Sequence, residues 1–155
     1  MPGPESLLGG RNAQPLSDHE VMRVGTAIIS MDGKVPFKHA PGERTRCRVY
    51  QEAGETICEV VFGPDIFPGA SVIDSNAALS MNAAVAHELS HYHRWRDKIE
   101  IDDLNLTHLD EALTSLDAVH RFNQHLSEAD IRQLVADAMQ RLQMFAGQFD
   151  AVPKA

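Results

Sequence analysis

The segment that most restricts the fold of this chain is Ala83-Ala84-Val85-Ala86-His87-Glu88-Leu89-Ser90-His91. Its alanines favour a helix, and Ser80 can cap one that runs to about residue 97. On a helix, residues i and i+4 lie one turn apart and about 40° apart around the axis, so His87 and His91 can bind one metal ion. Glu88 lies about 100° round from His87, where it can reach a metal-bound water without being a ligand. The segment predicts a metal-binding helix with Glu88 as general base; a helix that holds two histidines by coincidence is the alternative.

A third protein ligand is expected, because catalytic zinc is held by three and keeps a fourth position for water. The candidate is Glu111, on a second predicted helix that the capping motif Thr107-His108-Leu109-Asp110 opens and that runs to about residue 122. Glu111 belongs neither to the expected polar stripe of this helix nor to its expected apolar face, so it needs a partner such as a metal. The alternative is a first-turn glutamate that the helix dipole stabilises. The expected polar stripe is Asp110, Thr114, Asp117 and Arg121, and the expected apolar face is Leu109, Leu113, Leu116 and Val119.

Other histidines and polar side chains lie near these segments. His93 lies about 240° round from His87 on the same helix, so we expect it to face away from the metal. One side chain should stabilise the tetrahedral intermediate of a hydrolysis, and the sequence does not choose among the candidates: Tyr92, His108, His120, His125 and Arg121.

The N-terminal half predicts an arm, one helix and a hairpin. Residues 1–16 are rich in Gly, Pro and small polar residues, which indicates a flexible arm, and residues 17–150 are expected to form a single domain. Ser17 and Glu20 fit a capping box for a helix at about 18–30, and turns are expected at 32–33 and 41–42. Residues 45–62 predict a β-hairpin around residues 52–55, and a third short strand is expected at about 69–74.

The last predicted helix opens at Ser127, and its apolar stripe is interpreted as core with no chemical signal. That stripe is Ile131, Leu134, Val135, Ala138, Leu142 and Phe145. Together the elements predict an α+β fold, in which a small antiparallel or mixed sheet of about three strands packs on about four helices.

The predicted hairpin places Cys47 and Cys58 on its inner face, where the metal-binding helix should pack, and Arg46 and Arg48 opposite Glu59 on the other face. Two cysteines make no disulfide framework. Buried reduced cysteine behaves as a small hydrophobe. The alternative is that one thiolate occupies the open position of zinc in a resting enzyme.

Charge and composition limit the kinds of molecule or membrane to which the protein is expected to bind. The formal net charge of −8 argues against broad binding to nucleic acid. A local basic run, residues 44–48 with Lys34 and Lys38 upstream, is interpreted as a solvated strand face or as a small basic edge that touches a nucleic-acid strand. No apolar stretch approaches the roughly 20 residues of a membrane helix, and the N-terminus has no signal-peptide pattern. A cytoplasmic protein is expected.

The capped segment from Ser80 to Tyr92 resembles the metal helix of ImmA/IrrE-type peptidases, and Asp110-Glu111-Ala112 resembles the segment that supplies their third ligand. The resemblance covers about residues 44–122 and implies a zincin-like core. It implies a peptidase of the compact kind encoded beside transcription regulators in phage-defence operons, with a helix-turn-helix repressor as its substrate after DNA damage or infection. Single-stranded DNA as an activator is an extension of the same resemblance. The chain departs from the family at Ser90, where glycine is common, and at Ser115, where many related zinc peptidases carry an Asp that orients a histidine.

The sequence therefore predicts a zinc-dependent endopeptidase of narrow specificity, with His87, His91 and Glu111 as ligands and Glu88 as catalytic base. Narrow specificity is expected because a short single domain has few loops with which to build a broad cleft. The alternatives are a SprT-like protease that acts on DNA-bound proteins and a non-catalytic interaction module that zinc stabilises.

Overall fold

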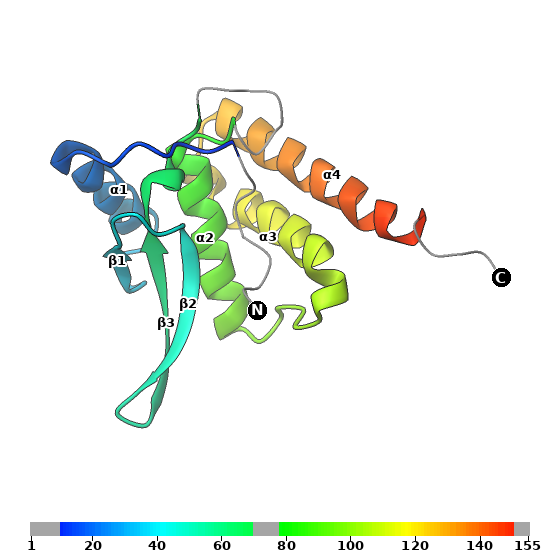
Figure 1. Cartoon of the computed structure of the whole chain (residues 1–155), viewed down its shortest axis with the longest axis horizontal. Coiled ribbons are helices and arrows are strands. Elements are labelled where there is room, and N and C mark those ends of the chain that lie inside the picture. Colours follow the sequence, from blue (N-terminus) through cyan, green and yellow to red (C-terminus); the bar gives the residue numbers. More distant parts are fainter. Residues whose placement is uncertain (1–9, 70–77, 151–155) are drawn as a thin grey trace.

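Four α-helices and a three-stranded mixed sheet make up the part of the chain that the computed structural model describes, residues 10–69 and 78–150 (Figure 1). In chain order they are α1 (Asp18–Met31), β1 (Phe37–His39), β2 (Arg46–Glu52), β3 (Glu55–Phe62), α2 (Met81–Arg96), α3 (Thr107–Phe122) and α4 (Glu128–Asp150). Short 3-10 turns lie at Pro64–Ile66, Leu104–Leu106 and Asn123–His125. The predicted α+β class is confirmed.

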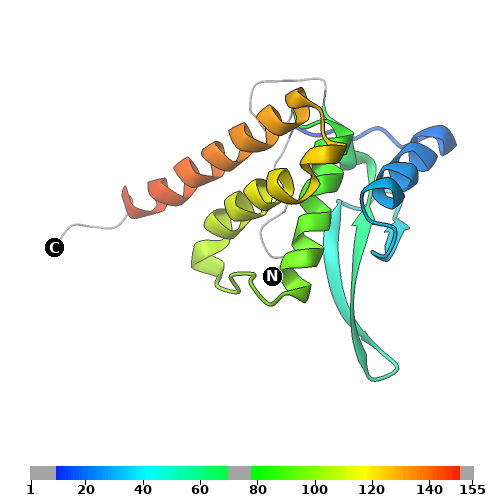
Figure 2. The same cartoon turned by 180° about the vertical axis from the view of Figure 1, so that it is seen from behind.

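Helix α2 lies at the centre of the molecule. It packs against β2 and β3 on one side, against α3 and α4 on the other, and against α1, as both views show (Figures 1 and 2). Ala83, Ala84 and Ala86 are fully buried and are small enough to let the neighbouring elements approach closely. Because nearly every face of this helix is covered, its polar side chains must find their partners inside the protein.

The sheet has the order β1-β3-β2, with β1 parallel and β2 antiparallel to β3. The predicted hairpin and its register are confirmed, since Arg48 pairs with Glu59 and Cys47 with Val60. Its two-residue turn has positive φ at Ala53 (51°) and Gly54 (80°), the geometry that matches the twist of a tight hairpin. The hairpin tip extends beyond the helices (Figures 1 and 2).

The third strand of the sheet is β1, in a stretch that the sequence predicts as turns and loop. Three residues after Pro36 are too few to show a strand period, and their pairing partner is the edge of β3, which is distant in sequence. The strand expected at about 69–74 lies almost wholly outside the described residues, which resume at residue 78.

The helices begin and end close to the predicted residues. Ser17 and Glu20 form the capping box of α1, and Ser80 caps α2. The capping motif predicted at Thr107 is wrong: a 3-10 turn runs directly into α3, and the Thr107 hydroxyl donates to the carbonyl of Leu104. Lys98, with a φ of 59°, ends α2 in the left-handed conformation.

The faces predicted for α3 are also wrong. Leu113 and Leu116 are 36% and 40% exposed, whereas Asp110 and Thr114 are buried. Helix α3 packs against both α2 and α4, and that double contact buries the side of the helix that carries Glu111. Asp110 tolerates burial because Arg94 donates to it at 2.5 Å, and the backbone N–H of Ile101 donates to the same oxygen.

Of the expected N-terminal arm, residues 1–9 lie outside the described residues. Arg11 donates hydrogen bonds to the carbonyls of Asp65, Ile66 and Leu79, which attaches the described start of the chain to the segments that flank the sheet. Among the helices that the structure describes, none is both long and apolar enough to cross a bilayer.

Candidate metal centre

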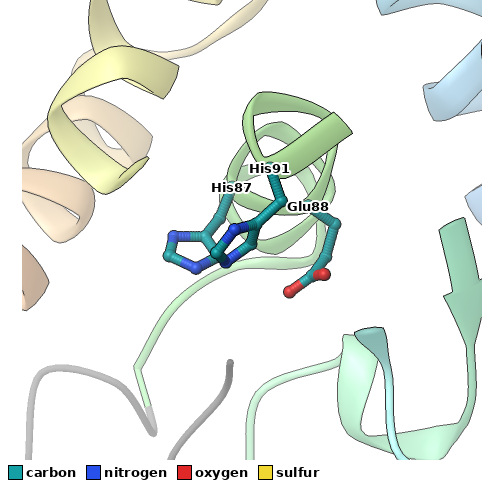
Figure 3. A group of neighbouring side chains, drawn as sticks. All are labelled: His87, Glu88 and His91. Carbon is teal, nitrogen blue, oxygen red and sulfur yellow. The ribbon is translucent and has the colours of Figure 1, made fainter. Parts of the chain in front are cut away.

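The two histidines of the sequence motif lie one turn apart on α2 with their imidazoles side by side (Figure 3). Their ring centroids are 4.8 Å apart, and His87, Glu88 and His91 are 0%, 0% and 7% exposed. The Glu88 carboxylate points to the neighbouring side of the helix (Figure 3). One ligand atom from each of the three residues lies within 4.8 Å of the other two, as the helical spacing predicts.

Helix α3 brings Glu111 to the same point. Its Oε2 lies 2.9 Å from Nε2 of His87 and 3.2 Å from Nε2 of His91. Two ligand atoms that each stand about 2.0–2.1 Å from a tetrahedral ion are about 3.3–3.4 Å apart, close to these separations. Two imidazole nitrogens and a carboxylate oxygen therefore converge with the chemistry and spacing of a metal-binding set.

Asp110 also lies near His91 and Glu111. Its Oδ1 already accepts hydrogen bonds from Arg94 and from the backbone of Ile101. Within the part of the chain that the structure describes, the Arg141 guanidinium lies 3.6 Å from Oε2 of Glu111, which is beyond hydrogen-bond distance. Of the two neighbouring carboxylates, Glu111 is therefore the better placed to hold an ion.

The pKa shifts reflect how tightly the charges converge. Burial acts to lower the pKa of His91, but the carboxylates of Glu111, Glu100 and Glu88 outweigh burial and raise it well above the usual value. Burial acts in the opposite direction on Glu111, yet the imidazoles of His91 and His87 hold the pKa of this carboxyl well below its ordinary value. The site therefore favours a positive charge between these groups, which a bound cation supplies as well as a proton does.

The outer side of His87 is held by residues from α3 and α4. Nδ1 of His87 lies 2.8 Å from the hydroxyl of Ser115, and that hydroxyl donates to Asp137 at 2.7 Å. Arg141 donates to the same oxygen of Asp137 at 2.9 Å. Helix α4, whose apolar stripe is interpreted as core, therefore also contributes two charged side chains to the hydrogen bonds behind His87.

The buried face of α4 is rotated relative to the predicted apolar stripe. Leu134 and Ala138 are buried as expected, but Val135 is 40% exposed, and Asp137 and Arg141 are 0% and 1% exposed. A signal for this was present, because an Asp and an Arg four residues apart lie at the edge of the stripe and can pair on a helix. Nothing in the local sequence indicates that they contact Ser115 and Glu111 of α3.

A cleft of about 190 Å³ opens beside the convergent ligands. Cys47, Val49 and Cys58 of the hairpin form one side of it, and Trp95, Glu100 and Glu111 lie among its other lining residues with His91, Arg44 and Arg46. An adjoining groove of about 740 Å³ extends past Trp95 along the loop from Lys98 to Asp102. His91 and Glu111 line both spaces and are therefore within reach of an extended ligand.

The other histidines and polar side chains considered from the sequence lie outside the group formed by His87, His91 and Glu111. His93 faces away from the set, as predicted, with Nε2 2.6 Å from Asp32 at the end of α1. Arg121 pairs with Asp117 at 3.0 Å, Tyr92 contacts the rings of His93 and Trp95, and His120 and His125 are exposed. Among the residues that the structure describes, the lining of the cleft includes neither these side chains nor His108.

Both cysteines lie on the face of the hairpin that packs toward α2, as predicted. The Cys47 thiol donates to the backbone carbonyl of Glu88 at 3.2 Å. A hydrogen bond with Cys58, burial and the charge of Glu88 raise the pKa of Cys47 well above its usual value. In this arrangement Cys47 is a neutral donor to the helix that carries the histidines.

Comparison of the chain with protein-family models, with curated proteins and with solved structures finds no match. The resemblance to ImmA/IrrE-type peptidases therefore stays a prediction, and the geometry of the site carries the proposal that follows.

Proposed function

We propose that this protein is a zinc-dependent endopeptidase in which His87, His91 and Glu111 hold the ion and Glu88 is the general base. The observation that carries the proposal is the convergence of the two imidazoles and Glu111 beside an open cleft, with the Glu88 carboxylate next to them. Zinc is the ion we propose, because two imidazole nitrogens and one carboxylate oxygen are the ligands of many catalytic zinc sites.

Bound between these ligands, zinc would polarise a peptide carbonyl and make the attacking water more acidic. The protein residues supply the rest of the chemistry. Glu88 accepts the proton of the water during attack and delivers it to the leaving amine. Its position next to His87 on a buried helix fixes the carboxylate relative to the ligands, so little reorganisation is needed during the reaction.

The cleft supports a peptide substrate held in an extended form. Cys47, Val49 and Trp95 offer apolar surface, while Arg44, Arg46 and Glu100 place charges of both signs around it. We propose a protein substrate recognised narrowly, and the family resemblance makes a helix-turn-helix transcription regulator the first candidate. Cleavage would then follow DNA damage or phage infection, in the cytoplasm, with single-stranded DNA as a candidate activator.

The test combines metal analysis with one conservative substitution. Purified protein should hold about one equivalent of zinc per chain. Glu88→Gln should keep that zinc and lower the rate of cleavage of a proteome-derived peptide library by about 10²–10⁴-fold, the usual contribution of a general base. Casein should be digested slowly by either form.

Glu59→Gln is a matched control, because Glu59 is also buried but pairs with Arg48 outside the lining of the cleft. It should retain both zinc and cleavage. Protein without stoichiometric zinc would refute the metal centre. Zinc without any cleavage that depends on Glu88 would leave the non-catalytic zinc-stabilised module as the better description.

A further inference from the structure

A chain of hydrogen bonds links His87 to helix α4. Nδ1 of His87 lies 2.8 Å from Oγ of Ser115, and Ser115 donates to Oδ2 of Asp137 at 2.7 Å. Nε of Arg141 donates to the same Oδ2 at 2.9 Å. The chain passes from α2 through α3 to α4, three elements that no short-range sequence signal connects.

The direction of each bond follows from the chemistry of the groups. The Arg141 guanidinium only donates, so the Oδ2 of Asp137 that it contacts is an acceptor. The single hydroxyl proton of Ser115 is directed to Asp137, which leaves the serine oxygen as an acceptor toward His87. Nδ1 of His87 therefore donates to the serine oxygen, and in a ring that binds a metal the lone pair would be on Nε2, the nitrogen beside Glu111.

Arg141 also reaches the ligand set from a second direction. Its NH1 lies 3.6 Å from Oε2 of Glu111. One guanidinium thus lies beside two buried carboxylates, Asp137 and Glu111.

The location of these groups is costly in free energy. Ser115, Asp137 and Arg141 are 0%, 0% and 1% exposed. A buried ion pair is often no more stabilising than apolar side chains of the same volume. A gain in stability is therefore a poor explanation for the burial of Asp137 and Arg141. Both ions instead contact groups that touch the proposed metal ligands.

We propose that Ser115, Asp137 and Arg141 are positioning residues that fix the ring orientation and tautomer of His87 and the orientation of Glu111 for metal binding. The inference rests on the proposed metal centre but not on peptide hydrolysis. Asp137 thus acts on a metal-binding histidine through a serine, from a helix that contributes no ligand of its own.

Ser115→Ala and Ser90→Ala test the inference as a matched pair. Both serines are fully buried, on α3 and α2, but within the described residues the Ser90 hydroxyl has no hydrogen-bond partner. Ser115→Ala should lower zinc affinity, measured by competition with a chromogenic chelator, by about 10–100-fold, as loss of an outer partner of a metal-binding histidine does. Ser90→Ala should leave zinc affinity unchanged, and both metal-free variants should keep the helical circular dichroism of the wild type.

Asp137→Asn should lower zinc affinity in the same way, and if this variant fails to fold, the serine pair decides. A measurement on unsubstituted protein is independent of folding effects: the ¹⁵N NMR spectrum of the zinc-loaded form should show Nδ1 of His87 protonated and Nε2 metal-bound.

Equal zinc affinity for Ser115→Ala and Ser90→Ala, or a proton absent from Nδ1, would overturn the positioning role while leaving the zinc centre standing. Wild-type protein that binds no zinc would overturn the metal centre and this inference with it.

Discussion

His91 and His93 lie on the same helix, both are more than nine-tenths buried, and both contact a carboxylate. His93 meets the single carboxylate of Asp32 at 2.6 Å and otherwise contacts the rings of Tyr92 and Phe122. His91 lies among the carboxylates of Glu111 and Glu100, with the imidazole of His87 beside it.

The pKa shifts of the two histidines have opposite signs. Burial dominates at His93 and lowers its pKa despite the hydrogen bond to Asp32. At His91 burial has the same effect, but several carboxylates overcome it and raise the pKa. A single buried histidine–carboxylate pair is thus an ordinary structural contact, and only the convergence of several such groups makes a place for a cation.

The sharpest test of this contrast is the pair His91→Ala and His93→Ala. His91→Ala removes a proposed ligand, so zinc affinity should fall by more than the roughly 10–100-fold that loss of an outer partner costs. His93→Ala should retain stoichiometric zinc. Elemental analysis after dialysis against a weak chelator measures both, and retention of zinc by His91→Ala with loss in His93→Ala would reverse the assignment of the two helix faces.

The contrast itself could be predicted from the sequence, because the position of a side chain around a helix is a local property. Helical spacing places His87 and His91 together and directs His93 away, and the strand period sets the pairing of Arg48 with Glu59. Glu111 is expected for a reason that the structure corrects, because it lies on the buried side of α3 with Ser115 and Ala118 and not between a polar and an apolar face.

What could not be predicted depends on contacts between elements. The exposure of Leu113 and the burial of Asp110 follow from the packing of α3 against two helices at once, which no single-helix pattern contains. Asp137 and Arg141 contact Ser115 and Glu111 of α3, which are distant in sequence, and β1 forms because β3 offers it an edge. Local periodicity identified the proposed ligands, and tertiary packing determined which side chains support them.

The dependence of zinc binding on pH should follow the protonation of His91 and not that of His93. Because the pKa of His91 is raised, its protonated form stabilises the metal-free protein. This stabilisation is complete at pH values below about 6.5, the ordinary pKa of histidine, and it is lost as the pH rises through the raised pKa. Zinc must displace this proton, so its apparent affinity should fall about tenfold, or about 1.4 kcal/mol, for each pH unit below the raised pKa.

Thermal unfolding of metal-free and zinc-loaded protein across this range measures the effect. The gain in melting temperature on adding zinc should grow with pH in the wild type and in His93→Ala alike. A gain that is constant with pH would contradict competition between a proton and the ion at His91.

A smaller effect, on stability rather than on zinc binding, is expected at His93. Asp32→Asn keeps an oxygen that can accept from Nε2 of His93 but removes the charge, so the free energy of unfolding should fall by about 0.5–1.5 kcal/mol. Urea denaturation of the zinc-loaded protein measures the loss, and zinc content should not change. Loss of zinc in this variant would mean that the two histidine environments are coupled through α2.

The smallest effect is expected where the hairpin touches the same helix. The Cys47 thiol donates to the backbone carbonyl of Glu88, and a serine hydroxyl at this position can donate to the same oxygen. Cys47→Ser should therefore change the free energy of unfolding by less than about 1 kcal/mol and leave zinc content and basal cleavage as they are. A thiolate that occupied the open position of zinc in a resting enzyme would give a different result, because its removal would free that position for water. A rise in basal cleavage in Cys47→Ser at unchanged zinc content, measured on the same peptide library as the wild type, would show that the hairpin restrains the site rather than merely packing against it.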